Sequence, residues 1–76
     1  MAKRLSQKRS ITVAGHRTSI TLEHEFWESL KDIARLRGVS VNALIAEIDA
    51  DQPENLSSAL RLFVLKHYKE KSNPVF

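Results

Sequence analysis

Three hydrogen-bonding side chains alternate along one short segment of this 76-residue chain. Arg17, Ser19 and Thr21 are each separated by one residue, and the apolar Ile20 and Leu22 alternate with them. Successive side chains of an extended strand point to opposite faces, so this spacing places the three polar groups on one face. A guanidinium group donates hydrogen bonds in pairs, and hydroxyls both donate and accept, which suits binding to a surface rich in acceptors.

Catalysis and metal binding are not expected from the other reactive side chains. The chain has no cysteine, and its three histidines are His16, His24 and His67. His24 and Glu28 have an i, i+4 spacing that a metal could use, but scattered histidines without a thiolate make a poor metal site. No nucleophile turn or glycine-rich phosphate loop accompanies the serines. We therefore predict a protein that is not an enzyme and needs no metal or other cofactor.

Positive charge is concentrated at the N-terminal end. Residues 1–17 carry a formal charge of +5 with no acid, residues 18–54 carry −5, and residues 55–76 carry +3. The basic side chains of the first segment are Lys3, Arg4, Lys8, Arg9 and Arg17. Such a segment favours an anionic partner such as nucleic acid, although a basic tail is also a common solubilising feature. Charge alone leaves both interpretations open.

The hydrophobic periodicity predicts one strand followed by three helices. The predicted elements are a strand at about 16–22 and helices at about 24–37, 41–51 and 56–71. Gly38 is the residue type that commonly closes a helix, and Ser40 suits the N-cap of the next one. We assign residues 1–15 to a basic N-terminal arm and residues 16–76 to a single domain.

The segment before the strand allows a second interpretation. Residues 10–13 repeat the polar and apolar alternation of residues 19–22, and a reversal at Ala14-Gly15 would form a hairpin. That hairpin would place Ile11 and Val13 on the same face as the apolar strand residues. However, the favoured two-residue turns require a positive φ at the first turn residue, which alanine tolerates poorly. We therefore prefer an arm over a hairpin.

The small size of the chain and its solitary strand both predict association with a second copy. A chain this short buries only roughly 60% of the surface that it exposes when unfolded. An unpaired strand leaves backbone groups without partners. Antiparallel pairing of two copies satisfies both needs and creates a two-stranded ribbon, which fits the major groove of B-DNA. The predicted dimer core consists of Ile20, Leu22, Phe26, Trp27, Leu30, Ile33, Leu44, Ile45, Ile48, Leu60, Phe63 and Val64.

Two stretches carry a resemblance to a known family. Thr18-Ser19-Ile20-Thr21-Leu22, followed by Gly38-Val39-Ser40-Val41-Asn42-Ala43-Leu44-Ile45, resembles the ribbon-helix-helix domain of the Arc/MetJ superfamily. With residues 9–19 and 55–62 included, the chain is similar to a bacterial subfamily that adds a C-terminal helix. The expected fold class is therefore mainly α: a ribbon-helix-helix (β-α-α plus a third helix) in an intertwined homodimer with a two-stranded antiparallel ribbon.

The resemblance implies a sequence-selective DNA-binding protein that regulates transcription and reads the major groove. By position, Arg17, Ser19 and Thr21 would contact bases. Free backbone N–H groups at the start of the second helix would bind a phosphate. The implied phosphate contacts are Ser40, Val41 and Asn42, with Lys3, Arg4, Lys8 and Arg9 in the arm. Thr21 departs from the family, which often has a larger polar residue there, and the acidic Glu23 follows it.

The third predicted helix suggests an alternative function. Its middle, residues 59–65, is apolar nearly all the way round, and such a helix must be covered on more than one side. The alternative is a protein-interaction module of antitoxin type, in which this helix binds a partner protein; assembly of dimers into a dimer of dimers is also left open. No segment approaches the ~20 apolar residues that span a bilayer. We expect a soluble cytoplasmic protein that binds double-stranded DNA and no membrane.

Overall fold

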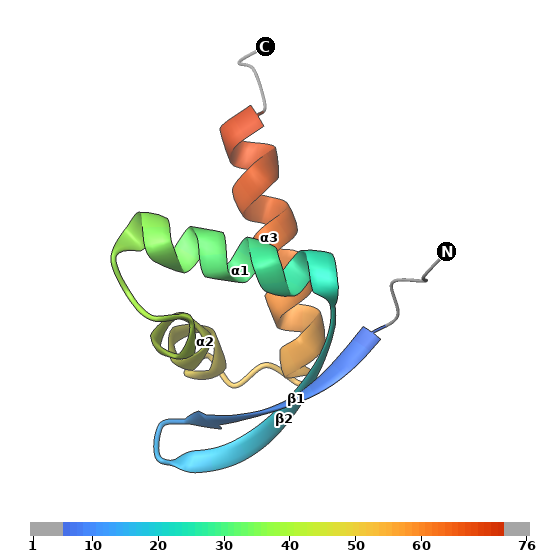
Figure 1. Ribbon diagram of the computed structural model, residues 1–76, viewed down its shortest axis with the longest axis vertical. Helices are drawn as coiled ribbons and strands as arrows, with labels where there is room; N and C mark the ends of the chain where they lie inside the picture. The colour runs from blue at the N-terminus through green and yellow to red at the C-terminus, as the bar shows by residue number, and fades with distance from the viewer. Residues whose placement is uncertain (1–5, 73–76) are drawn as a thin grey trace.

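The computed structural model describes residues 6–72, which form a two-stranded hairpin and three helices (Figure 1). The elements are β1 (Ser6–Val13), β2 (His16–Glu23), α1 (His24–Arg37), α2 (Val41–Asp49) and α3 (Leu56–Ser72). In Figure 1 the hairpin curves from below α2 up the right side to the start of α1, and the C-terminal half of α3 extends past α1. This order confirms the mainly α fold class, with one strand more than predicted, whereas the intertwined homodimer, whose ribbon would take a strand from each copy, stays a prediction.

The ribbon is formed within one chain. β1 and β2 pair antiparallel, in a register that runs from Ser6 opposite Glu23 to Val13 opposite His16. The expectation of an unpaired arm is therefore wrong for residues 6–13, and the hairpin alternative is correct. Because β2 finds its hydrogen-bonding partner in its own chain, the solitary-strand argument no longer requires a second copy.

The turn of the hairpin has the backbone geometry that the sequence analysis judged unfavourable. Ala14 has a φ of 52° and Gly15 a φ of 85°, so both turn residues lie in the left-handed region. A left-handed conformation disfavours alanine by roughly 1–2 kcal/mol. Val13, next to the turn, is only 1% exposed, and burial of a valine side chain contributes roughly 1.5–3 kcal/mol. Together with the ladder of hydrogen bonds, this burial outweighs the strain at Ala14.

Capping residues mark the end of α1 and the beginnings of α2 and α3. Gly38, with a φ of 74°, closes α1 in the left-handed conformation, as expected. The Ser40 hydroxyl accepts from the Ala43 N–H (3.0 Å) and caps α2. Asn55 caps α3, because its side-chain oxygen accepts from the Ser58 N–H at 3.0 Å. Ser40 and Asn55 satisfy backbone donors that every helix leaves without partners in its first turn, whereas the Gly38 N–H donates to carbonyl oxygens in the last turn of α1.

The core lies between the inner face of the hairpin and the three helices. Of the twelve residues predicted for a dimer core, eight are buried within this one chain, and Phe26, Trp27, Ile48 and Phe63 are partly buried against them. The eight are Ile20, Leu22, Leu30, Ile33, Leu44, Ile45, Leu60 and Val64. Val13 also belongs to this core. A single copy therefore already encloses a continuous hydrophobic core.

Candidate nucleic-acid interface

The outer face of the hairpin carries a row of polar side chains. Partners in an antiparallel pair share a face, so Arg17, Ser19 and Thr21 of β2 lie beside residues of β1 on the side away from the helices. The paired residues are Lys8 with Thr21, Ser10 with Ser19, and Thr12 with Arg17. All six are exposed, whereas Ile20 and Leu22 on the other face are buried. We call these six residues the outer hairpin face.

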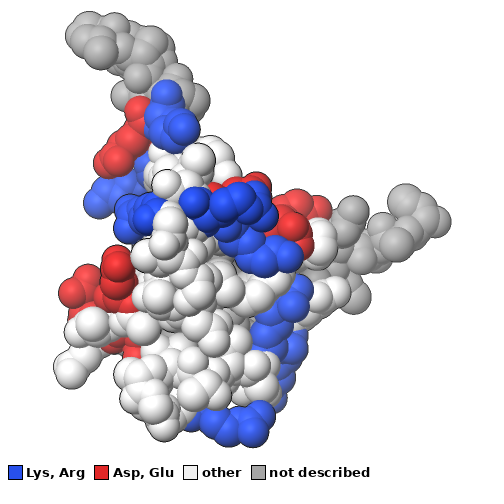
Figure 2. Space-filling model, turned by 60° about the vertical axis from the view of Figure 1, so that its left-hand side comes forward, with Lys and Arg blue, Asp and Glu red and all other residues white. Residues whose placement is uncertain are grey.

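The outer hairpin face combines positive charge with hydroxyl groups. Lys8 and Arg17 supply its charges, and its other four residues are serines and threonines. Figure 2 shows the Lys and Arg side chains of the hairpin as a blue run along the lower right edge, with no red among them. Such a surface attracts an anion over its whole length while offering both donors and acceptors at close range.

The acidic residue at the end of β2 has a cationic partner. Glu23, at the end of β2, accepts a hydrogen bond from Arg61 of α3 over 2.9 Å. The two side chains are about one-third exposed, at 33% for Glu23 and 32% for Arg61. The sequence analysis noted this acid directly after Thr21, the residue that departs from the family pattern. Arg61 compensates that charge at the edge of the hairpin.

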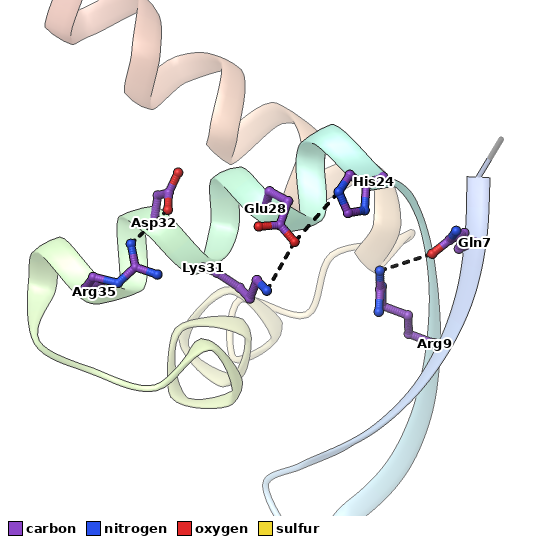
Figure 3. A network of polar contacts seen from close by, with 7 residues as sticks. All are labelled: Gln7, Arg9, His24, Glu28, Lys31, Asp32 and Arg35. Carbon is purple, nitrogen blue, oxygen red and sulfur yellow. Dashed lines mark hydrogen bonds and ion pairs between the residues drawn. The ribbon is translucent and has the colours of Figure 1, made fainter. Parts of the chain in front are cut away.

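Arg9 lies on the inner face of the hairpin, toward the helices, and not on the outer hairpin face. Figure 3 shows its side chain pointing from β1 toward the helices, where it donates to Gln7 at 3.1 Å. Its guanidinium carbon lies 4.4 Å from the centre of the Trp27 ring, a cation–π distance. Arg9 is half-buried, while its neighbour Lys8 is exposed on the outer face. The hairpin therefore separates two cations that the sequence analysis placed together.

The start of α2 lies beside the turn end of β1. The Asn42 side-chain amide donates to the Thr12 carbonyl oxygen over 3.5 Å, which ties the first turn of α2 to the hairpin. Asn42 and Ser40 are exposed, and Val41 is half-buried. The three residues predicted to bind a phosphate are thus adjacent to one end of the outer hairpin face. Of the four phosphate contacts predicted in the arm, Lys8 and Arg9 lie on β1, and Lys3 and Arg4 lie outside the described residues.

Several charged side chains of α1 pair with one another, away from the outer hairpin face (Figure 3). Glu28 pairs with Lys31 at 3.1 Å and lies 3.9 Å from His24, and Asp32 pairs with Arg35 at 3.0 Å.

Within residues 6–72, no group of three or more His, Cys, Asp or Glu side chains could hold a metal ion. In the same range, no helix is long and apolar enough to cross a membrane.

Sequence analysis missed Ser10 and Thr12, which the hairpin brings to the outer face. The signal was present, because residues 10–13 share the alternation of residues 19–22. It was discounted on the turn geometry of Ala14 alone. The contacts of Ser57 and Arg61 with β2 were not predicted either. Hydrophobic periodicity reports on neighbours within one element, and Ser57 is 36 positions away from Thr21.

Comparison with known proteins identifies a family for the chain. Residues 6–68 match the model of a family described as the ribbon-helix-helix domain, and this match covers most of the chain, including both strands and most of α3. No curated protein and no solved structure matches the chain.

Proposed function

The chain belongs to the ribbon-helix-helix domain family, and from that premise we propose that it binds double-stranded DNA through the outer hairpin face and regulates transcription. Members of this family are generally DNA-binding transcription regulators or antitoxins, which bind DNA as dimers and are not enzymes. The proposal includes selective reading of a DNA sequence in the major groove.

The observation that carries the proposal is the composition of the outer hairpin face. All six of its side chains are exposed and hydrogen-bonding, two are cationic and none is acidic. Arg17 is suited to donate two hydrogen bonds to a guanine, and the hydroxyls of Ser19 and Thr21 can serve several bases. This composition favours modest rather than strict sequence preference. We assign base contacts to these three residues of β2.

We propose that DNA is bound by a homodimer in which the β2 strands of two copies lie side by side. With strands roughly 4.8 Å apart, each β1 would lie about 7 Å from the axis between the copies. The major groove is about 12 Å wide, so β1 would meet its walls, where the phosphates are. Lys8, Ser10 and Thr12 would then contact the DNA backbone, and β2 would face the base edges.

The first turn of α2 would add a phosphate contact at the end of each hairpin. The backbone N–H groups of Val41 and Asn42 lie in the first turn of α2, where the helix leaves donors without partners and its dipole favours an anion. Asn42 holds that turn against Thr12 of the hairpin. A phosphate beside the outer hairpin face would therefore be within reach of α2.

Fluorescence anisotropy with labelled duplexes pooled from genomic fragments tests this function. We expect binding that weakens steeply with salt, because phosphate contacts release counterions. Lys8→Ala should reduce the slope of the salt dependence by about one for each copy bound. Lys31→Ala is the matched control, because Lys31 is paired with Glu28 on α1, away from the hairpin. A stable homodimer that binds none of the duplexes at low salt would refute the proposal.

A second candidate is the antitoxin type, in which α3 binds a partner protein. Leu62 and Leu65 of α3 are 64% and 52% exposed. Leu62 also lines a shallow groove of about 360 Å³ together with Ile48 and Pro53. One partner retained in stoichiometric amount, and lost with Leu62→Asp but not with Lys71→Asp, would support this function. If duplex binding were absent in the same preparation, this function would replace DNA recognition.

A further inference from the structure

The outer edge of β2 is partly occupied by α3. The Thr21 N–H donates to the Ser57 hydroxyl oxygen at 2.9 Å, and the Arg61 guanidinium donates to the Thr21 carbonyl oxygen at 3.2 Å. Arg61 also donates to Glu23 at 2.9 Å, which holds its guanidinium at this edge. We call these contacts of Ser57 and Arg61 the edge latch. Both backbone groups with which Thr21 could pair to another strand are therefore already satisfied.

The rest of this edge is open. In an antiparallel pair, the backbone groups of alternate residues point to the same side of the strand. Arg17 and Ser19 therefore direct their N–H and C=O groups to the same edge as Thr21, away from β1. Within residues 6–72, neither backbone has a hydrogen bond from outside the hairpin. Four backbone groups are available there to a second strand.

Resting on the proposed DNA-binding homodimer, we propose that the edge latch fixes the register in which two β2 strands pair. The symmetry axis passes at Thr18, so that Arg17 of each copy lies opposite Ser19 of the other. This register uses all four open backbone groups. An axis at Ser19 requires the backbone of Arg17 in the second copy to hydrogen-bond with the backbone of Thr21. The N–H and C=O groups of Thr21 are already paired with the edge latch. An axis at Arg17 places Ser19 against Gly15 in the turn.

The register determines how far apart the two Arg17 side chains stand on DNA. With the axis at Thr18, the two Cα atoms are offset by two residues along the ribbon, which gives a separation of roughly 8 Å. With the axis at Ser19, the offset is four residues and the separation roughly 14 Å. Base pairs are spaced by about 3.4 Å, so the two registers address guanines about two or four base pairs apart. Ser57 and Arg61 are thus positioning residues for DNA recognition.

Disulfide trapping distinguishes the registers. Because the chain has no native cysteine, any disulfide must form between the introduced cysteines. With the axis at Thr18, the Cα atoms of position 19 in the two copies are roughly 8 Å apart, beyond the roughly 7 Å that a disulfide can bridge. Ser19→Cys alone should therefore form little covalent dimer under mild oxidation. The double variant Arg17→Cys/Ser19→Cys places cysteines directly opposite, at roughly 5.5 Å, and should cross-link roughly tenfold faster or more. Thr12→Cys is the exposed control on β1.

Removal of the edge latch should change this pattern. In Ser19→Cys combined with Ser57→Ala and Arg61→Ala, Thr21 is free to pair, the axis moves to Ser19, and the two cysteines face each other. We expect covalent dimer formation to rise roughly tenfold over Ser19→Cys alone. Helical circular dichroism establishes that this triple variant is folded. If it is not, the two variants with an intact edge latch still decide the register.

Two results would overturn the register alone, and a third would also contradict the proposed homodimer. Rapid cross-linking of Ser19→Cys with the edge latch intact would place the axis at Ser19. Failure of the double variant to cross-link, in a chain that sediments as a homodimer, would exclude the axis at Thr18. A chain that sediments as a monomer at every concentration would contradict the homodimer of the proposed function, and with it the register.

Discussion

Replacement of Ala14 by asparagine should stabilise the protein, because Ala14 is the strained residue of the hairpin turn. Ala14 has a φ of 52°, a conformation that asparagine adopts readily and that disfavours alanine by roughly 1–2 kcal/mol. The strain on alanine varies with the exact left-handed geometry, so we expect the free energy of unfolding to rise by about 1 kcal/mol, the lower end of that range. For a domain of this size, 1 kcal/mol raises the melting temperature by roughly 4–8 °C.

Thermal unfolding followed by circular dichroism measures this effect, with all variants at one protein concentration because association stabilises the folded state. Ala50→Asn is the matched control, since Ala50 is also exposed but has an ordinary φ of −62°. Gly15→Ala should have the opposite effect of about −1 kcal/mol from backbone strain alone, because a Cβ at Gly15 meets no atom within 4 Å. If Ala14→Asn leaves the melting temperature unchanged or lowers it, residues 13–16 do not form this turn.

Three further substitutions test the core, a helix cap and the face on which Arg9 lies. Leu44→Ala should lower the free energy of unfolding in urea by about 2–5 kcal/mol, because Leu44 is fully buried; a loss under about 1 kcal/mol would contradict its place in the core. Ser40→Ala should cost about 1 kcal/mol by the same measurement, through loss of the hydrogen bond to the Ala43 N–H, and no loss would mean that water replaces the cap. Arg9→Ala should shift the fluorescence of Trp27, the single tryptophan of the chain, and weaken duplex binding less than Lys8→Ala does; equal losses of binding would place both cations on the DNA.

Local patterns were enough to predict the helices and the outward residues of β2. The i, i+3 and i+4 spacing of Leu30, Ile33 and Ala34 predicted the buried stripe of α1, and Gly38 marked the end of that helix. These features depend only on neighbours within one or two turns. The alternation of β2 likewise predicted that Ile20 and Leu22 face the core and that Ser19 faces outward.

The hairpin was mispredicted because one local preference was weighed without its tertiary compensation. The strain at Ala14 could be read from the sequence, whereas the burial of Val13 against the helices could not. That error moved Lys8 and Arg9 into one arm, although strand alternation sends them to opposite faces. The edge latch could not be predicted at all, since the contact of Thr21 with Ser57 depends on how α3 packs across the hairpin.

Protection of guanine N7 from dimethyl sulfate methylation shows whether the outer hairpin face enters the major groove, because N7 lies in that groove. On a duplex selected from the genomic pool, we expect protected guanines in two symmetry-related positions. Arg17→Ala should remove that protection, while Lys31→Ala should keep it. Binding that leaves every N7 reactive, or N7 protection that survives Arg17→Ala unchanged, would contradict the placement of the outer hairpin face in the major groove.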